Sequence, residues 1–443
     1  MNLPKTVLEL MQQLRQEGFA AWAVGGCVRD QALGIAPHDY DLCSDALPEQ
    51  MQRVFAHRHL VLAGVKHGTV GVVTDDGVVE ITTFRTEGDY TDSRHPGWVR
   101  FVPTVQEDLA RRDFTVNAMA YCPEQGYADP FGGLEDLHNR ILRAVGDPIR
   151  RFREDALRIL RGVRFAARFG LEIEQGTWAA MLSERGGLDA LARERVFEEL
   201  SKLLVLADAQ MLIKISPILA QVIPQLEPMM GFCQHSPHHA YDVFTHTAYV
   251  TEQVPPEPVL RFAALLHDVG KPACFTRDET GRGHFYGHAQ TGAQMADQIL
   301  RSLKAPTALR EEAVWLIEHH MADYPAERKA ARRALSRHGI QRMRRLMALA
   351  LADANSKGVV EAEDGRLRLT EFSRLLEELS QEEGQMSLKK LAVKGQDLME
   401  LGYARGPELG RTLDRLLEQV ISEQLPNARD ELMAQAQAWL ADN

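Results

Sequence analysis

Two aspartates separated by a single residue, Asp39 and Asp41, follow a pair of adjacent glycines, Gly25 and Gly26. If residues 39–42 form a strand, alternate side chains point to the same face, so the two carboxylates converge. Converging carboxylates supply the oxygen ligands that Mg²⁺ takes while it is shared with substrate phosphates. Glycine, which has no Cβ, lets the backbone approach a triphosphate closely and offer its N–H groups. This stretch therefore predicts a site for metal ions and a nucleoside triphosphate.

A later stretch, residues 154–168, holds a second set of candidate binding residues. Its apolar stripe predicts a helix on which Asp155 and Arg158 are i,i+3 neighbours, so their head groups can act on one plane. A carboxylate accepts hydrogen bonds and a guanidinium donates them, which matches the amino donor and ring-nitrogen acceptor of cytosine and adenine. Guanine and uracil reverse that pattern, and each bidentate contact discriminates by ~1–3 kcal/mol. The alternative is an intrahelical salt bridge with solvated arginines.

The region around this stretch is strongly basic. From Arg140 to Arg168 there are nine arginines and only three acids, although the whole chain carries a formal net charge of −11. Binding to nucleic acid depends on a local basic face and not on the net charge. The region therefore predicts a phosphate-binding surface on an otherwise acidic protein.

The elements that must position these residues change character along the chain. An amphipathic helix over residues 5–17 precedes strand-like runs, which cover residues 20–24, 39–42, 69–74 and 78–83. An Asp-Asp-Gly turn joins the last two runs as a hairpin. After about residue 145, helical periodicity dominates. We therefore expect an α+β protein, with a small mixed-sheet head followed by a mostly α-helical body.

The composition is that of a globular protein, with 45% hydrophobic and 26% charged residues, and 443 residues predict about two to four domains. The five cysteines contain no CxxC pair, which is typical of reduced thiols in a cytosolic protein. No stretch has the pattern of a targeting signal, and no run of 18 apolar residues occurs. We therefore expect a cytoplasmic protein without a membrane partner.

Two motifs carry a resemblance to a known family: GGCVRDQALGIAPHDYDLCSD at residues 25–45 and RRDFTVNAMA at residues 111–120. Together they resemble the signature of the nucleotidyltransferase superfamily, in the branch of the tRNA CCA-adding enzymes and bacterial poly(A) polymerases. The resemblance implies that Asp39 and Asp41 are catalytic and hold Mg²⁺. It also implies a nucleotide-binding set: Gly26, Arg29, Arg112, Asp113, Asp155, Arg158, Arg161 and Arg164.

The members of this set have different implied roles. The triphosphate is held by Gly26, Arg29 and Arg112, while Asp113 serves the triphosphate and ribose with Asn117 nearby. The base is selected by Asp155 and Arg158, and phosphates or Asp155 are contacted by Arg161 and Arg164. The sequence alone leaves a simpler alternative for Arg112, because a helix from about Val105 would pair it with Asp108 in an i,i+4 salt bridge. A helix over residues 193–200 resembles the last motif of the family, and we expect it to support the selecting helix.

Residues 233–355 are rich in histidine, and the doublet His267-Asp268 is followed by Gly-Lys-Pro. This pattern resembles the HD phosphohydrolase superfamily. The resemblance implies a second divalent ion, held by His246, His267, Asp268 and Asp353, with His288 and either His319 or His320 completing a fuller site. Imidazole and carboxylate ligands suit Mg²⁺, Mn²⁺ or Ni²⁺, and such an ion can activate water against a phosphoester. A lone buried histidine is more often a core residue, but here six positions follow in order.

These resemblances divide the chain into four expected domains. Residues 1–145 form the nucleotidyltransferase head, 146–205 a nucleotide-selecting and RNA-binding neck, 206–360 the HD-type metal-binding domain, and 361–443 a helical tail. The polar segment 84–102 carries Arg85, Glu87, Asp92, Arg94 and Pro96, which fit the flexible loop of the family. Enzymes that add only the two cytidines are described as lacking this loop, so its presence favours complete CCA addition.

The implied activity is template-independent addition of CCA to tRNA 3′ ends by two-metal nucleotidyl transfer, with tRNA, CTP and ATP as partners. A metal-dependent phosphohydrolase activity of the HD domain is a second expectation. Three alternatives stay open at this point. They are a poly(A) polymerase, an enzyme that adds only CC or only A, and an HD phosphohydrolase whose head merely binds RNA.

Overall fold

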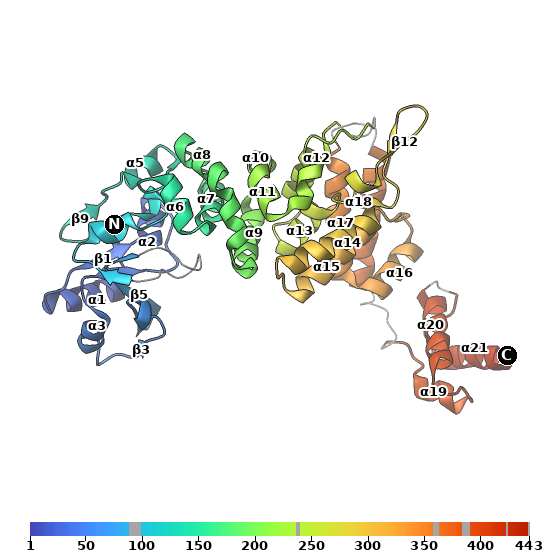
Figure 1. The fold of residues 1–443 in the computed structure, drawn as a ribbon. Coiled ribbons are helices and arrows are strands. Elements are labelled where there is room, and N and C mark those ends of the chain that lie inside the picture. Colours follow the sequence, from blue (N-terminus) through green and yellow to red (C-terminus); the bar gives the residue numbers. More distant parts are fainter. Residues whose placement is uncertain (88–98, 236–239, 358–362, 383–389, 422–423, 442–443) are drawn as a thin grey trace. The chain divides into compact units, whose positions relative to one another are not determined.

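The structure, a computed structural model, describes residues 1–87, 99–235, 240–357, 363–382, 390–421 and 424–441 (Figure 1). The chain forms two compact units, residues 1–207 with 214–224 and residues 208–213 with 225–443. The first combines a sheet with helices, and the described part of the second is helical apart from one short hairpin. The α+β class and the mixed-sheet head are therefore confirmed, while the division into four domains stays a prediction.

The head is built on a seven-stranded sheet with the order β3-β4-β5-β2-β1-β8-β9. β2 runs parallel to β5, and the other neighbouring pairs are antiparallel. The strands are β1 (Ala21–Val24), β2 (Leu42–Ser44), β3 (Leu60–Val61), β4 (Thr69–Thr74), β5 (Gly77–Thr83), β8 (Ala120–Cys122) and β9 (Gly126–Ala128). The helices of the head are α1 (Lys5–Gln16), α2 (Gly26–Ala32), α3 (Pro48–Val54), α4 (Val105–Ala110) and α5 (Gly133–His138).

A separate ladder joins β6 (Arg85–Glu87) to β7 (Val99–Phe101). β6 carries the first residues of the predicted loop element. The remaining members of that element, Asp92, Arg94 and Pro96, lie outside the described residues.

The predicted strands agree with the structure within one residue at each end, with one exception. The strand predicted at residues 39–42 is wrong, because β2 begins at Leu42. Its neighbour β1 ends at Val24, since Gly25 takes a positive φ of 74° and leads into α2. The N–H of Val24 still donates to the carbonyl oxygen of Asp41 at 3.0 Å, so the ladder with β1 ends at Asp41. The candidate aspartates therefore lie at one end of the central strands β1 and β2, and Asp41 lines a cleft there.

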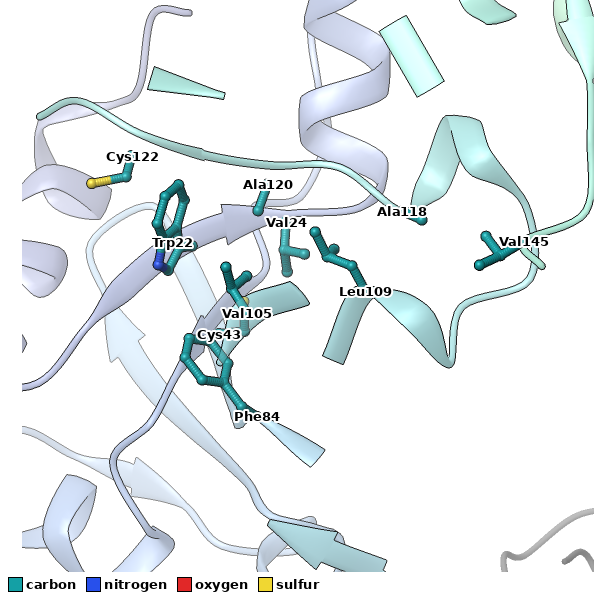
Figure 2. Close-up of a cluster of buried hydrophobic side chains, with 10 residues drawn as sticks. All are labelled: Trp22, Val24, Cys43, Phe84, Val105, Leu109, Ala118, Ala120, Cys122 and Val145. Carbon is teal, nitrogen blue, oxygen red and sulfur yellow. The ribbon is translucent and has the colours of Figure 1, made fainter. Parts of the chain in front are cut away.

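A buried hydrophobic cluster holds α4 against the sheet (Figure 2). Val105 and Leu109, one helical turn apart, are its contribution from α4, and each large apolar side chain buried this way stabilises the fold by ~1.5–3 kcal/mol. The cluster consists of Trp22, Val24, Cys43, Phe84, Val105, Leu109, Ala118, Ala120, Cys122 and Val145. Because α4 is fixed, the motif that follows it at residues 111–120 is fixed as well.

The helical part of the first unit packs on this motif through Phe114. Its ring centroid lies 6.5 Å from that of Phe152 and 6.1 Å from that of Phe165. Those rings belong to α6 and α7, so both helices are held against the head. The helices here are α6 (Pro148–Glu154), α7 (Leu157–Phe169), α8 (Gln175–Glu184), α9 (Arg193–Leu206) and α11 (Ser216–Val222).

The second unit is a stack of helices: α12 (Val243–Gln253), α13 (Pro258–Leu266), α14 (His288–Ser302), α15 (Thr307–His319), α16 (Arg328–His338), α17 (Ile340–Asn355), α18 (Glu363–Glu382), α19 (Gly395–Glu400), α20 (Pro407–Ile421) and α21 (Arg429–Ala441). The last three helices share a small core of their own around Leu398, Leu416 and Leu432. None of the helices in the described residues has the length and apolar character to cross a bilayer.

The contact between α7 and the head gives a prediction about stability. A Cβ on Gly162 of α7 would lie 2.6 Å from Cζ of Phe114 and 2.5 Å from Cε of Met181. Gly162→Ala should therefore destabilise the first unit by about 1–3 kcal/mol, although alanine normally favours a helix. Gly186→Ala is the matched control, because a Cβ there meets nothing within 4 Å. Calorimetric melting should show a lower Tm for the first variant only, and equal shifts would contradict the packing argument.

Candidate active site and candidate metal centre

One cleft in the first unit collects most of the nucleotide-binding residues that the sequence predicts. It has a volume of ≈ 520 Å³. Its walls contain Gly25, Gly26, Arg29, Asp41, Arg111, Arg112, Asp113, Asn117, Asp155, Leu157, Arg158, Arg161, Phe165 and Arg195. Every predicted nucleotide-binding residue except Arg164 is among them, together with one of the two candidate catalytic aspartates.

Three carboxylates interact beside this cleft, at one end of the central strands of the sheet. Partial burial raises the pKa of Asp41, and the negative charges of Glu80 and Asp39 raise it further, while Arg112 opposes them. Glu80 lies on β5, whose parallel register puts Ile81 opposite Leu42 and thus Glu80 beside Asp41. The sequence analysis did not identify Glu80. A divalent cation would relieve the repulsion within this group, so the donor set fits Mg²⁺.

Gly25 and Arg112 form one wall of the cleft in close contact. A Cβ on Gly25 would lie 2.8 Å from Nη1 of Arg112, and the positive φ of this residue also favours glycine. Nη2 of Arg112 donates to Oδ2 of Asp108 at 3.4 Å, so the predicted i,i+4 salt bridge is present. The guanidinium is thereby held over the backbone of the glycine pair, where one anion can contact both.

Arg29 lines the cleft with its guanidinium already engaged. Its Nε and Nη2 donate to Oδ1 of Asp30 at 2.8 and 2.6 Å, and its Nη1 donates to Oδ1 of Asn117 at 2.6 Å. The guanidinium carbon also lies 4.4 Å from the ring centroid of Phe169. Burial lowers the pKa of Arg29, and Asp30 opposes that effect. With 6% of its surface exposed, Arg29 is built into the floor of the cleft.

Asp113 connects this floor to α7. Its Oδ1 accepts from the backbone N–H of Phe114 at 2.9 Å and from Nδ2 of Asn117 at 3.0 Å. Its Oδ2 accepts from Nε and Nη2 of Arg161 at 3.0 and 2.8 Å. Burial alone would raise the pKa of Asp113, but Arg161 and Asn117 outweigh it and lower that pKa to about 2. A carboxylate with four donors is saturated, so Asp113 acts as a structural link.

The continuous helix predicted through Asp155 and Arg158 is wrong. α6 ends at Glu154, and Asp155 takes an extended backbone conformation, with φ −149° and ψ 104°, before α7 begins. Its carboxylate accepts from the N–H of Leu157 at 3.0 Å and from Nη2 of Arg195 at 3.1 Å. Nη1 of Arg158 donates instead to Oε2 of Glu154 at 2.8 Å. Both head groups still line the cleft, but each is held by a partner of its own.

Arg164 is not among the residues that line the cleft. Its Nε donates to Oε2 of Glu199 on α9 at 2.6 Å, and both side chains are largely shielded from solvent. This position does not match the phosphate contact predicted for Arg164. It does match the supporting role expected for residues 193–200, since α9 supplies the partners of both Arg164 and Asp155.

The arginine-rich region presents less positive charge to solvent than its composition predicts. Most of its guanidinium groups form ion pairs with acids of the same unit, and the pairs are Arg143–Asp136, Arg150–Glu154, Arg151–Glu154, Arg153–Glu184, Arg158–Glu154, Arg161–Asp113 and Arg164–Glu199. These pairs fix the geometry of the neck, and they reduce the positive charge that is left to attract phosphates.

The second unit brings the predicted metal ligands together in its interior. Nε2 of His246 lies 3.0 Å from Oδ1 of Asp353 and 3.7 Å from Oδ2 of Asp268. Nε2 of His267 lies 3.2 Å from the same Oδ2 of Asp268. The residues come from α12, from the two positions directly after α13, and from α17, so the packing of these helices assembles the group.

Asp268 also faces a second group, which contains His288 and His320. Nε2 of His288 lies 3.5 Å from Oδ1 of Asp268, and the rings of His288 and His320 are 5.4 Å apart. Potential ligand atoms of these three residues lie within 4.8 Å of one another. The open choice between two neighbouring histidines therefore falls on His320. His319 stacks on Trp315 instead, with 4.3 Å between the ring centroids.

The donor chemistry of this histidine centre fits divalent cations. Nε2 of His267, His288 and His320 is buried in each case, and for His267 and His288 it faces the carboxylate of Asp268 at 3.2 and 3.5 Å. Nδ1 of His267 lies 2.7 Å from the carbonyl oxygen of Ala264, and that of His320 lies 2.6 Å from the carbonyl of Ile317. A proton on Nδ1 leaves Nε2 free to bind a metal. Burial lowers the pKa of His320 to about 4, so this ring is neutral at pH 7.

Two lysines contact the aspartates of the centre. Nζ of Lys271 lies 2.7 Å from Oδ2 of Asp268, and Nζ of Lys357 lies 3.3 Å from Oδ2 of Asp353. Burial by itself would raise the pKa of Asp268, but His267 and Lys271 hold it well below its ordinary value. The carboxylates are therefore ionised and ready to bind a cation. The sequence analysis gave no role to these lysines.

Comparisons with known proteins agree with both sites. The family model described as the poly A polymerase head domain matches residues 21–143, and an HD domain model matches residues 238–357. A third model, described as a probable RNA and SrmB-binding site of polymerase A, matches residues 170–230. The first unit thus contains a nucleotidyltransferase head of the poly(A) polymerase type, and the second contains an HD domain.

Proteins that are similar to this chain over nearly its whole length identify the family within this class. The chain is 34% identical to a CCA-adding enzyme of Streptococcus thermophilus over 97% of its length and 96% of that protein. It is 33% identical to a CCA-adding enzyme of Levilactobacillus brevis over 96% of its length and 95% of that protein. The crystal structure of the Bacillus stearothermophilus CCA-adding enzyme in complex with CTP matches with a TM-score of 0.71 and 27% identity, over 100% of this chain and 99% of that one. The chain belongs to the CCA-adding enzyme family.

The saturated carboxylate of Asp113 gives a prediction about pH. Its pKa is lowered in the folded state from about 3.8 to about 2, so it stabilises the fold above pH 4, and this contribution is lost as the pH falls towards 2. Asp113→Asn should therefore cost about 2 kcal/mol of unfolding free energy at pH 7. Urea titrations of both proteins should show this difference shrinking between pH 4 and pH 2. A difference independent of pH would contradict the role of the ionised carboxylate.

Proposed function

We propose that this chain adds CCA to the 3′ ends of tRNA, using CTP and ATP without a nucleic-acid template. The observation that carries the proposal is the single cleft that collects metal-binding carboxylates, a glycine–arginine wall for phosphates, and an Asp–Arg pair that can select the base. Membership in the CCA-adding enzyme family supports the same substrates. The chain would act as a transferase on tRNA, with two nucleoside triphosphates as donors.

The reacting groups would meet beside these carboxylates, at one end of the central strands of the sheet. Mg²⁺ ions bound there would lower the pKa of the tRNA 3′-hydroxyl and neutralise charge on the transferred phosphate. Asp39 and Asp41 would hold these ions, with Glu80 as a third carboxylate beside Asp41. The 3′-oxygen forms a bond to the α-phosphorus, the bond to the pyrophosphate oxygen breaks so that pyrophosphate leaves, and the hydroxyl proton passes to solvent water.

The triphosphate would lie against Arg112 and the backbone of Gly25 and Gly26, since their close contact offers a guanidinium and N–H groups to one anion. Arg29 and Asp113 act differently from the direct contacts predicted for them. The guanidinium of Arg29 is bonded to Asp30 and Asn117, and the carboxylate of Asp113 is bonded to Asn117 and Arg161. Both residues therefore hold the walls of the cleft in position.

Selection of the base would depend on Asp155 and Arg158, because an acceptor beside a donor pairs with the amino and ring-nitrogen groups of cytosine and adenine. Arg195 holds the carboxylate of Asp155, and Glu154 holds the guanidinium of Arg158. Each head group thus has a fixed direction before a nucleotide binds, which reduces the ordering entropy that binding costs.

The experiment is an extension assay on a tRNA that lacks CCA. We expect addition of C, C and A with CTP and ATP together, two cytidines with CTP alone, and no addition with GTP or UTP. Asp41→Ala and Glu80→Ala should each slow addition roughly a thousandfold, because metal binding supplies several kcal/mol of transition-state stabilisation. Asp75→Ala is the matched control, since this acid lies in the exposed turn of the same hairpin as Glu80.

The same assay separates the alternatives. Long tails on any RNA from ATP alone would indicate a poly(A) polymerase, and products that stop after CC, or that need CC already present, would indicate a partial enzyme. An unchanged rate in Asp41→Ala would contradict the metal assignment. No addition under any condition would leave the head as an RNA-binding module.

We propose that the histidine centre carries a second activity. It binds divalent cations and hydrolyses phosphoesters, because its imidazoles and ionised carboxylates form two donor groups that share Asp268. Hydrolysis adds water: its oxygen bonds to phosphorus, the ester P–O bond breaks, and the released oxygen takes a proton. Lys271 and Lys357 lie where they can contact the phosphate oxygens of the substrate.

The five cysteines are all free thiols, which supports a cytoplasmic site of action for both activities.

The two neighbouring histidines of α15 give a sharp test of this centre. His320→Ala should remove a ligand and strongly reduce both bound divalent metal, measured by mass spectrometry, and hydrolysis of a 2′,3′-cyclic nucleotide. His319→Ala should leave both unchanged, because His319 stacks on Trp315 outside the group. Both variants should still extend tRNA. Absence of hydrolysis in the unaltered chain with Mg²⁺, Mn²⁺ and Ni²⁺ would contradict the proposal.

A further inference from the structure

The segment that leads into the candidate metal site of the head has few backbone hydrogen bonds. At its end, the N–H of Val24 donates to the carbonyl oxygen of Asp41 at 3.0 Å, and β2 follows directly. Before that point, within the described ranges, no backbone–backbone hydrogen bond involves residues 36–40. Asp39 and Tyr40 both lie in this stretch. The position of the Asp39 carboxylate therefore depends on the contact that fixes Tyr40.

Gln31, which lies on α2, contacts this stretch through Tyr40. Its Nε2 donates to the hydroxyl oxygen of Tyr40 at 3.2 Å and also to the carbonyl oxygen of Asn2. Its Oε1 accepts from the backbone N–H of Asn2 at 2.9 Å. Because Asn2 engages both ends of the amide, the group cannot turn over without losing those bonds. The amide nitrogen of Gln31 is therefore kept directed at Tyr40.

Packing holds Tyr40 only weakly on this side. A cavity of ≈ 480 Å³ borders the contact, and Gln31 and Tyr40 both line it. Side-chain atoms that face a cavity lose the dispersion contacts that a filled core provides. The chain beside Asn2 is anchored, in contrast, because the side chain of Leu3 is buried. The hydrogen bonds of Gln31 therefore restrain Tyr40 from a fixed part of the head.

The helix that carries Gln31 also forms the phosphate side of the cleft. Gly26 begins α2, and Arg29, two residues before Gln31, lines the cleft. A metal ion that acts in nucleotidyl transfer must contact the carboxylates and the substrate phosphates together. The carboxylates must therefore lie at a fixed distance from the start of α2, and Gln31 joins this helix to the residue between the two aspartates.

We infer that Gln31 and Tyr40 are positioning residues for the metal site of the head. The hydrogen bond between them sets where the carboxylates of Asp39 and Asp41 lie relative to the phosphate-binding start of α2. Neither Gln31 nor Tyr40 is among the described residues that line the cleft, so both act through the aspartates. The inference rests on the proposed nucleotidyl transfer and extends the set of residues on which its metal binding depends.

Binding of Mn²⁺ to the full chain in the presence of CTP, measured by electron paramagnetic resonance, is the first test. The manganese that Asp41→Ala fails to bind defines the head site. Gln31→Ala and Tyr40→Phe should each weaken its binding about two- to tenfold, the range that one hydrogen bond contributes. The double variant should be no weaker than either single variant, since the same bond is lost once. Gln12→Ala and Tyr127→Phe are the matched controls, because both side chains are exposed outside this contact.

Nucleotide addition to a tRNA that lacks CCA provides the second readout. In Gln31→Ala, the Mg²⁺ concentration for half-maximal rate should rise by the same factor, while excess Mg²⁺ restores kcat and leaves KM for CTP unchanged. A loss of rate that excess Mg²⁺ does not restore would indicate a merely structural role.

Two results of the manganese measurement would overturn the inference and leave the proposed function intact. They are an unchanged Mn²⁺ affinity in both single variants, and effects that add in the double variant. Weaker Mn²⁺ binding by the variants of a chain that adds no nucleotide under any condition would support the positioning role and contradict the proposed function.

Discussion

The geometry of the nucleotide cleft depends on one buried charge, the carboxylate of Asp113. A buried ion is tolerated only when its partners satisfy it, and removing one partner typically costs ~3–5 kcal/mol. The donors to Asp113 come from Asn117 in the head and from Arg161 on α7, while Asn117 also accepts from Arg29 on α2. Satisfying this one carboxylate therefore fixes the head against the helices of its own unit.

That constraint matters because the two halves of the proposed chemistry lie on different elements. The carboxylates proposed to bind metal lie just before β2 and on β5, and the pair proposed to select the base lies at the junction of α6 and α7. The distance between them must match the length of one nucleotide. Gly162 and Phe114 set how closely α7 approaches the head, and the bond from Arg161 to Asp113 sets the position along the helix. Apolar packing and a buried ion pair thus together determine the distance between the two halves of the proposed site.

The sequence was sufficient where the pattern is local. The first helix, the hairpin of β4 and β5 and the residue types of the cleft were all predicted, since they follow from periodicity, turn residues and motif spacing. It failed where a partner lies far along the chain. The carboxylates that hold Arg164 and Arg161 lie 35 and 48 residues away, and spacing within one helix cannot reveal them. Glu80 was missed for the same reason, because its position depends on a parallel pairing between β2 and β5.

The choice between His319 and His320 as a metal ligand could have been made from the sequence. The buried residues of α15 include Ala313, Leu316 and Ile317, a stripe with helical spacing. His320 continues this stripe at four residues from Leu316, whereas His319 follows Trp315 on another face. The periodicity that identifies a core face therefore also selects the ligand, because a metal centre inside a helical unit must draw its donors from the inward faces.

The fixed partners of the base-selecting pair explain how two side chains can discriminate as strongly as the proposed function needs. A bidentate contact contributes ~1–3 kcal/mol, which corresponds to a factor of roughly 5 to 150 between right and wrong bases. That range applies only if the side chains cannot turn to satisfy the wrong base. Because Arg195 restrains Asp155 and Glu154 restrains Arg158, guanine or uracil would meet an acceptor facing an acceptor and a donor facing a donor. Selectivity in this cleft then depends on the acids and bases of α6 and α9 as much as on the pair that contacts the base.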